Sequence, residues 1–175
     1  MGNPDYNSLE LRGALLMLPF DKYPGGGVTL LGKMSGGNCR KGYGFTLQKI
    51  TKQHICAYCG INLTSNFYRW LLTSVDHVVP VKECERLGIP TQFAQDYSNM
   101  VLCCLACNAF NNRYRVKDYN HKTKWTLSEF FLLRDEVFLK RKGKIKKSLE
   151  LDKGFFNEKI KRISFDTDRS NICEY

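Results

Sequence analysis

Two pairs of cysteines with the same short spacing place the strongest constraint on how this chain folds. Two residues separate Cys56 from Cys59, and two residues separate Cys104 from Cys107. A Cys-x2-Cys turn directs both thiolates to one point, and two such turns together form a tetrahedral zinc site. The sequence therefore predicts a structural zinc ion that joins two distant segments. Cys103 is an alternative ligand, but only Cys104 gives the two-residue gap to Cys107.

The eight cysteines of this 175-residue chain are also compatible with a secreted disulfide scaffold. A secreted protein is expected to begin with a signal peptide, but the apolar stretch at residues 14–20 is short and has no basic leader. No segment approaches the roughly 20 apolar residues that are needed to cross a bilayer. We therefore expect a cytoplasmic protein with no membrane partner, in which paired cysteines bind metal rather than each other. The remaining cysteines are interpreted as ordinary thiols: Cys39, Cys84 and Cys173.

The segment between the two cysteine pairs, residues 60–103, is 44 residues long and exceeds what a simple zinc ribbon contains. A further structural unit must therefore lie within it. Residues 71–81 have strand propensity, and residues 99–103 form a second predicted strand. Between the two strands, residues 82–87 are compatible with a helical turn that Gly88 closes.

A helix is predicted directly after Cys104, the first cysteine of the second pair. From Cys104 through Arg115 the spacing is helical, with Cys107, Phe110 and Tyr114 on one face. The resulting order is strand, strand, helix. The predicted fold class is α+β, with a small ββα core that the four-cysteine zinc site holds together.

The regions on either side of the core, which we assign to residues 51–118, differ in composition. Residues 1–50 are rich in glycine and are interpreted as an extension made of loops, with a hairpin as an alternative. Residues 119–175 are predicted to form a helical basic extension. Within it, Thr126-Leu-Ser-Glu129 has the capping-box pattern that begins a helix with an apolar stripe. A further amphipathic helix is predicted over much of residues 149–163.

The charge of the chain favours a polyanionic partner, with solubility alone as the alternative explanation. The net charge is +10, of which residues 119–175 contribute 14 − 9 = +5. Basic residues that follow the core or lie on the C-terminal helices are predicted to contact phosphate: Arg113, Arg115, Lys144, Lys146 and Lys147. The alternative for these residues is a solvated helix face. Phosphate contacts supply affinity without sequence preference.

The polar residues between and after the cysteine pairs complete a specific pattern. They are Asp76-His77-Val-Val-Pro80, then Asn99, and Asn108 directly after the second pair. In this order they resemble the HNH endonucleases of the ββα-metal superfamily, in the subgroup whose core is held by four cysteines. The resemblance covers a third of the chain. It implies that His77 is the general base, that Asp76 and Asn108 bind a catalytic cation, and that Asn99 holds the catalytic loop in place.

The chemistry of these residue types agrees with that implication. Hydrolysis of a phosphodiester needs a nucleophilic water and a cation that stabilises the charge on the phosphate and on the leaving oxygen. A histidine is available as a base near neutral pH, because its usual pKa is about 6.5. Carboxylate and amide oxygens suit Mg²⁺ or Mn²⁺, whereas four thiolates suit Zn²⁺. His121 and His54 are interpreted as non-catalytic, although His54 is near enough to the first pair to compete for zinc.

The leading functional hypothesis is a DNA endonuclease, and assembly as a homodimer stays open. One alternative is a non-catalytic, zinc-containing nucleic-acid-binding module in which Asp76 and His77 are structural. The joint presence of Asp76, His77, Asn99 and Asn108 weighs against it, because binding alone needs none of them. Another alternative is an RNA-directed nuclease, since the cleaved linkage is chemically similar.

Overall fold

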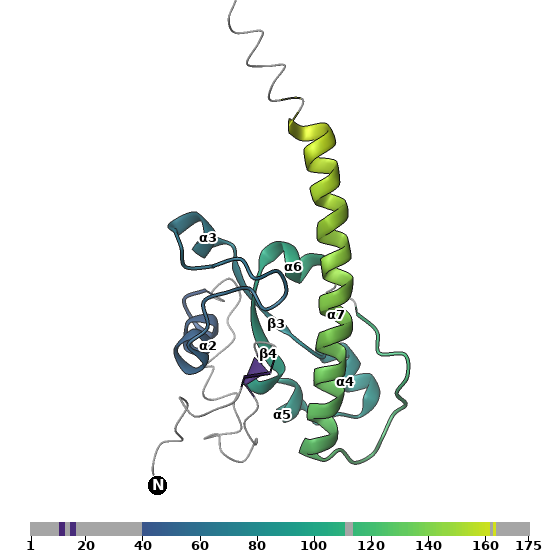
Figure 1. Cartoon of the computed structure of the whole chain (residues 1–175). Coiled ribbons are helices and arrows are strands. Elements are labelled where there is room, and N and C mark those ends of the chain that lie inside the picture. The colour runs from purple at the N-terminus through teal and green to yellow at the C-terminus, as the bar shows by residue number, and fades with distance from the viewer. Residues whose placement is uncertain (1–10, 13–14, 17–39, 111–113, 162, 164–175) are drawn as a thin grey trace, which may run out of the picture.

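The computed structural model describes residues 11–12, 15–16, 40–110, 114–161 and 163 (Figure 1). The first two of these stretches, β1 (Leu11–Arg12) and β2 (Leu15–Leu16), pair antiparallel. The other residues before position 40, which include Cys39, lie outside the described residues, as do Arg113 and Cys173. No described helix is both long enough and apolar enough to cross a membrane.

The centre of the molecule is a two-stranded antiparallel sheet of β3 (Thr73–His77) and β4 (Met100–Cys104). The register pairs Thr73 with Cys104 and His77 with Met100. All of β4 and most of β3 are buried. The side chains of β4 are apolar, whereas β3 buries Thr73, Ser74 and Asp76 beside Val75. Both predicted strands are therefore confirmed. The pairing places the second cysteine pair at one end of the sheet and His77 at the other.

Short helices connect the two strands: α4 (Val81–Leu87), α5 (Thr91–Ala94) and the 3-10 turn η3 (Tyr97–Asn99). Gly88 ends α4 with a φ of 72° in the left-handed region, as predicted. A side chain at this position would also collide with the backbone oxygen of Lys122. This close approach brings the chain that follows the core back against α4.

The helix that follows Cys104, α6 (Leu105–Phe110), contains Cys107 and is shorter than predicted. The expectation of helix through Arg115 was wrong, because Tyr114 and Arg115 are not helical. Tertiary hydrogen bonds draw the chain towards α4 instead. The Val116 amide donates to Glu83 Oε2 at 2.9 Å, and Arg86 donates to the Val116 carbonyl at 2.6 Å.

In the described part of the chain, two helices precede β3, and the sequence predicted neither. The first, α2 (Tyr43–Thr51), lies in the segment interpreted as loops and buries Leu47 against the sheet. Its glycine-rich flank concealed the apolar spacing that forms the helix. The second, α3 (Phe67–Leu71), begins at Asn66, whose side chain accepts a hydrogen bond from the Arg69 amide.

The longest element is α7 (Leu127–Phe155), followed by a π-helical turn, η4 (Phe156–Ile160). The predicted capping box is present, with Thr126 and Glu129 exchanging hydrogen bonds. The expectation of two separate helices was wrong, because lysine-rich sequence favours helix and no proline interrupts it. In Figure 1, α7 runs past the sheet and its C-terminal part extends beyond the other helices. The face towards the core carries Phe130, Leu133, Arg134, Val137, Phe138, Arg141 and Ile145.

Candidate active site

The four predicted zinc ligands form one cluster. The sulfur atoms of Cys56, Cys59, Cys104 and Cys107 all lie within 4.8 Å of one another, and Cys59 Sγ is 3.9 Å from Cys104 Sγ. Zinc–sulfur bonds of about 2.3 Å in a tetrahedron require sulfur atoms about 3.8 Å apart. The thiolate donor set therefore fits zinc. Cys103 is fully buried outside the cluster, so the preference for Cys104 is confirmed.

The local backbone explains how each cysteine pair points its side chains inwards. Gly60 adopts a φ of 75° and its amide donates to the Cys56 carbonyl at 2.9 Å, which closes the first turn. The Cys104 amide lies 3.4 Å from Cys56 Sγ, and the Cys107 amide lies 3.5 Å from Cys104 Sγ. These N–H groups favour negative sulfur.

Four thiols packed this closely do not ionise together without a cation. Burial raises the pKa of Cys59 to about 11, and the neighbouring thiols of Cys104 and Cys56 raise the pKa of Cys107. A zinc ion reverses this preference by binding the thiolate forms, so its binding releases protons. Zinc affinity is therefore expected to weaken as the pH falls.

Asp76 lies on β3 with its carboxylate in contact with two other elements. Tyr58, inside the first cysteine pair, donates its hydroxyl hydrogen to Asp76 Oδ2 at 2.6 Å. Arg141, from α7, forms an ion pair with the same oxygen at 2.7 Å. Burial raises the pKa of Asp76, while Arg141 and Tyr58 act in the opposite direction. One carboxylate thus connects the zinc turn, the sheet and the long helix.

His77 occupies the last position of β3. Its Nε2 lies 3.2 Å from Gln95 Oε1, and burial lowers the pKa of His77 below its usual value. The ring is therefore neutral at neutral pH, which is the form that accepts a proton.

Asn99 is fully buried beside the turn that follows His77. Its Oδ1 accepts from the Val79 amide at 3.0 Å, and its Nδ2 donates to the carbonyls of Val79 and Ala94 at 3.0 and 2.9 Å. The Val78 amide donates to the Asn99 carbonyl at 2.7 Å. These bonds hold the turn after His77 against η3, in the manner expected of a loop-positioning residue.

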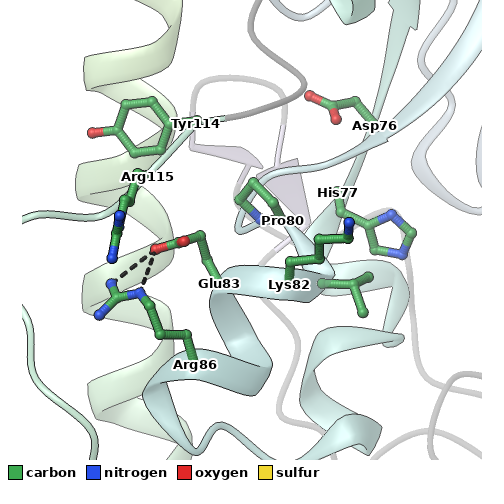
Figure 2. Close-up of a pocket in the computed structure, with 9 residues that line it drawn as sticks. Asp76, His77, Pro80, Lys82, Glu83, Arg86, Tyr114 and Arg115 are labelled. Carbon is green, nitrogen blue, oxygen red and sulfur yellow. Dashed lines mark hydrogen bonds and ion pairs between the residues drawn. The ribbon is translucent and has the colours of Figure 1, made fainter.

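A pocket of about 650 Å³ is lined by both Asp76 and His77, whose side chains point in different directions in Figure 2. This agrees with the alternation of side chains along a strand, since Asp76 and His77 are neighbours at the end of β3. The pocket is lined by residues from the end of β3, from α4 and from the segment before α7: Asp76, His77, Pro80, Val81, Lys82, Glu83, Arg86, Tyr114 and Arg115.

Asn108 does not line this pocket. Its Nδ2 donates to Ser74 Oγ at 2.9 Å. Ser74 lies two residues before Asp76, so both residues point to the same face of β3. The structure therefore places Asn108 and Asp76 on one face of the strand, with Asn108 nearer to the zinc end. Its role as a cation ligand stays a prediction.

The segment that contains these residues also matches a known protein family. The family model described as HNH endonuclease matches residues 56–113. This segment is an HNH endonuclease domain. No curated protein and no solved structure matches the chain. The HNH domain extends from the first cysteine pair past α6 and contains Asp76, His77, Asn99 and Asn108.

Arg141 is a residue outside the HNH domain that enters its centre, and sequence reasoning missed it. The guanidinium is fully buried and donates to the carbonyls of His77 and Val78 at 2.6 and 2.8 Å, besides pairing with Asp76. In the sequence, Arg141 belongs to the same basic run as Lys144, Lys146 and Lys147, which are predicted to contact phosphate, but its side chain is buried. The available signal was its place in the apolar stripe of α7, four residues before the buried Ile145.

The predicted phosphate-binding residues lie in different surroundings. Arg115 is exposed, lines the pocket that contains Asp76 and His77, and also lines an adjoining hollow of about 290 Å³ with Lys144. Lys144 lies 4.9 Å from the centre of the Tyr114 ring. Lys146 and Lys147 are exposed on α7, and Lys146 lies 4.0 Å from Glu150. Arg115 and Lys144 thus extend the positive surface of the pocket.

Proposed function

We propose that the HNH domain hydrolyses phosphodiester bonds of DNA in a metal-dependent reaction with His77 as general base. The observation that carries this proposal is the pocket that Asp76 and His77 share beside exposed cationic side chains. A four-cysteine site holds the same core together, and the HNH match covers both features. A module that only bound nucleic acid would not need a half-buried histidine with a lowered pKa in such a pocket.

His77 is the group that accepts the proton of the attacking water. With the Gln95 amide oxygen facing Nε2, that nitrogen carries the hydrogen and Nδ1 keeps its lone pair. The water oxygen bonds to phosphorus and the bond to the 3′ oxygen breaks, which leaves a 5′-phosphate and a 3′-hydroxyl. Asn99 and Arg141 position His77 through the backbone of the following turn.

The oxygen donors of Asp76 and Asn108 fit a hard divalent cation, because a carboxylate and an amide on one strand face match the preference of Mg²⁺ or Mn²⁺. Such a cation would stabilise the negative charge on the phosphate and on the leaving oxygen. Lys82 and Arg115 supply fixed positive charge at the pocket and favour the approach of a phosphate backbone.

The test is single-turnover cleavage of plasmid DNA with Mg²⁺, Mn²⁺ or EDTA. His77→Ala is expected to lose about 10² to 10⁴ in rate, because a general base acts in the chemical step. His121→Ala is the matched control, since this exposed histidine lies outside the HNH domain. Circular dichroism and zinc content verify that both variants fold.

Two outcomes would contradict the proposal in different ways. Cleavage by folded His77→Ala at the parental rate would remove His77 from the mechanism. A parent protein that binds DNA but cuts neither DNA nor RNA with any cation would favour the binding module. Cleavage of RNA alone would keep the proposed mechanism but would make RNA the substrate instead of DNA.

A further inference from the structure

The short helix α3 exposes a group of aromatic rings that the proposed mechanism does not use. Phe67 is 63% exposed and Tyr68 is 77% exposed, and no residue of α3 is buried. We call Phe67, Tyr68 and Trp70 the aromatic patch. Figure 1 shows α3 standing away from the sheet, on the side opposite to α7. These rings therefore contribute little to the core, and exposed apolar groups of this size mark interaction surfaces.

The rings of the patch contact one another. The ring centres of Phe67 and Trp70 are 6.0 Å apart at an interplanar angle of 28°, and those of Phe67 and Tyr68 are 5.8 Å apart at 64°. Phe67 thus packs face to face with one neighbour and edge to face with the other. The three rings therefore form one cluster, in which Phe67 and Tyr68 are exposed to solvent.

The helix that carries the patch is held in a defined position. Arg40 donates to the Leu71 carbonyl at 2.6 Å, and its guanidinium lies 5.6 Å from the centre of the Trp70 ring. The Leu105 amide donates to the Leu72 carbonyl at 2.8 Å, which connects the end of α3 to the second cysteine pair. The rings are therefore ordered before any ligand binds, which lowers the entropic cost of binding.

The segment of the sequence that contains the patch carries charges of one sign only. No Asp or Glu occurs from residue 22 to residue 75. The same segment contains only cationic charged residues: Lys22, Lys33, Arg40, Lys41, Lys49, Lys52 and Arg69. Arg69 lies within α3 and is exposed. An apolar surface for another protein does not require this asymmetry, whereas a polyanion does.

The patch lies at the opposite end of β3 from the His77 pocket. The chain passes from α3 directly into β3, whose last residue is His77. The four residue steps from Thr73 to His77 span about 13 Å at about 3.3 Å for each residue. Phosphates along one DNA strand repeat at about 3.4 Å or more, so several nucleotides would span the length of β3.

We propose that the aromatic patch stacks unpaired DNA bases of the strand that enters the His77 pocket. The inference rests on the proposed function, because it takes DNA as the substrate. Every base has a π face, so aromatic side chains beside cations bind single strands without sequence preference. A duplex hides these faces inside its own stack. Arg40 and Arg69 would contact the phosphates, and the patch would favour single-stranded, frayed or flipped-out substrate.

The experiment compares a short labelled DNA strand with an abasic strand of equal length, which keeps the phosphates and lacks the bases. Fluorescence anisotropy at fixed salt gives the affinity of each. The parent is expected to bind the base-containing strand more tightly. Phe67→Ala/Tyr68→Ala is expected to lose about 5- to 150-fold of that affinity while binding the abasic strand like the parent. Tyr68→Phe should behave as the parent, because the ring is kept.

The matched control is Phe155→Ala, which removes an aromatic ring that is 60% exposed on the distal part of α7. It is expected to leave both affinities unchanged. If the double variant fails to retain zinc, Tyr68→Ala alone carries the test, since this side chain is the most exposed of the patch. Its expected effect has the same direction.

Equal parental affinity for the two strands, or an unchanged preference in the variants, would overturn the inference. A dimer that the variants dissociate in sedimentation, with DNA binding unaltered, would assign the patch to a second copy and also overturn it. Plasmid cleavage by the same preparations separates this result from the proposed function. Base-dependent binding without cleavage would remove only the catalytic proposal, and cleavage without base-dependent binding would remove only the patch.

Discussion

Asp76 shows how much can depend on one carboxylate. Its Oδ2 accepts hydrogen bonds from Tyr58 and from Arg141, and it belongs to the pocket that contains His77. A bound cation at Asp76 would have to share this carboxylate with the Arg141 guanidinium. Arg141 thus neutralises the buried charge of Asp76 while its backbone contacts hold His77 in place.

Loss of Arg141 is expected to be strongly destabilising. Arg141→Met would leave the buried Asp76 without its charged partner, which typically costs about 3 to 5 kcal/mol. Urea denaturation measures the change in the free energy of unfolding. Lys147→Met is the matched control on the exposed face of the same helix. A variant at Arg141 that unfolds at the same urea concentration as the control would contradict the role of the ion pair.

The pH dependence of cleavage follows from His77. Burial lowers the pKa of His77 below the usual value of about 6.5, and protonation removes the lone pair that the base uses. The single-turnover rate is therefore expected to stay level through neutral pH and to fall only below about pH 6.5. A descending limb that begins above pH 7 would contradict this assignment.

At the scale of elements, the two cysteine turns and the sheet form one unit. The Ala57 amide donates to the Leu102 carbonyl at 2.9 Å, so the first turn continues onto β4. The four sulfur atoms then connect this turn to the start of α6. Removal of zinc is expected to separate the first cysteine turn from the start of α6, because these two segments are far apart in the sequence and few other bonds connect them.

Adjacent cysteines provide the sharpest test of the zinc site. Cys104→Ser should lose zinc, because it removes one of four ligands. Cys103→Ser should keep zinc and lose about 1 to 3 kcal/mol of stability, because it buries a hydroxyl in place of a thiol. Metal analysis and thermal unfolding measure both effects. Zinc lost in Cys103→Ser and retained in Cys104→Ser would reverse the assignment.

The long helix α7 combines two functions along its length. Its first half packs Phe130, Val137 and Phe138 onto the core and brings Arg134 and Arg141 to backbone carbonyls of the HNH domain. Its exposed face carries lysines that extend the positive surface beside the catalytic pocket. The helix outside the family match thus contributes to the order of the site inside it.

At the scale of the whole molecule, the net charge of +10 favours DNA through the release of counterions. Each phosphate that a lysine neutralises should add about 0.9 to the slope of log affinity against log salt. Lys144→Ala is expected to flatten the slope by this amount, because Lys144 adjoins Arg115 and the pocket. Lys146→Ala, beside Glu150, is the control and should change it less. Equal slopes for the parent and Lys144→Ala would mean that this lysine only faces solvent.

Features that depend on a few neighbouring residues were predictable from the sequence. The spacing of Cys56, Cys59, Cys104 and Cys107 determines a metal site wherever the turns meet, because two-residue gaps leave the thiolates little choice of direction. The left-handed conformation of Gly88 and the capping box at Thr126 were predictable for the same reason, because each depends on residues within one helical turn. The order of strand, strand and helix also came from local propensity and was confirmed.

Contacts between distant segments were decided only by the tertiary structure. Arg141 looks like its lysine neighbours in the sequence, and only the packing of α7 turns it inwards to residues more than 60 positions away. The hydroxyl of Tyr58 meets Asp76 because β4 pairs with β3 and also binds the first cysteine turn. The helix α6 ends early because Glu83 and Arg86 bind the chain that follows. The local sequence specifies which side chains each element carries. The packing of these elements into one core, with its buried charges, decides which side chains come into contact.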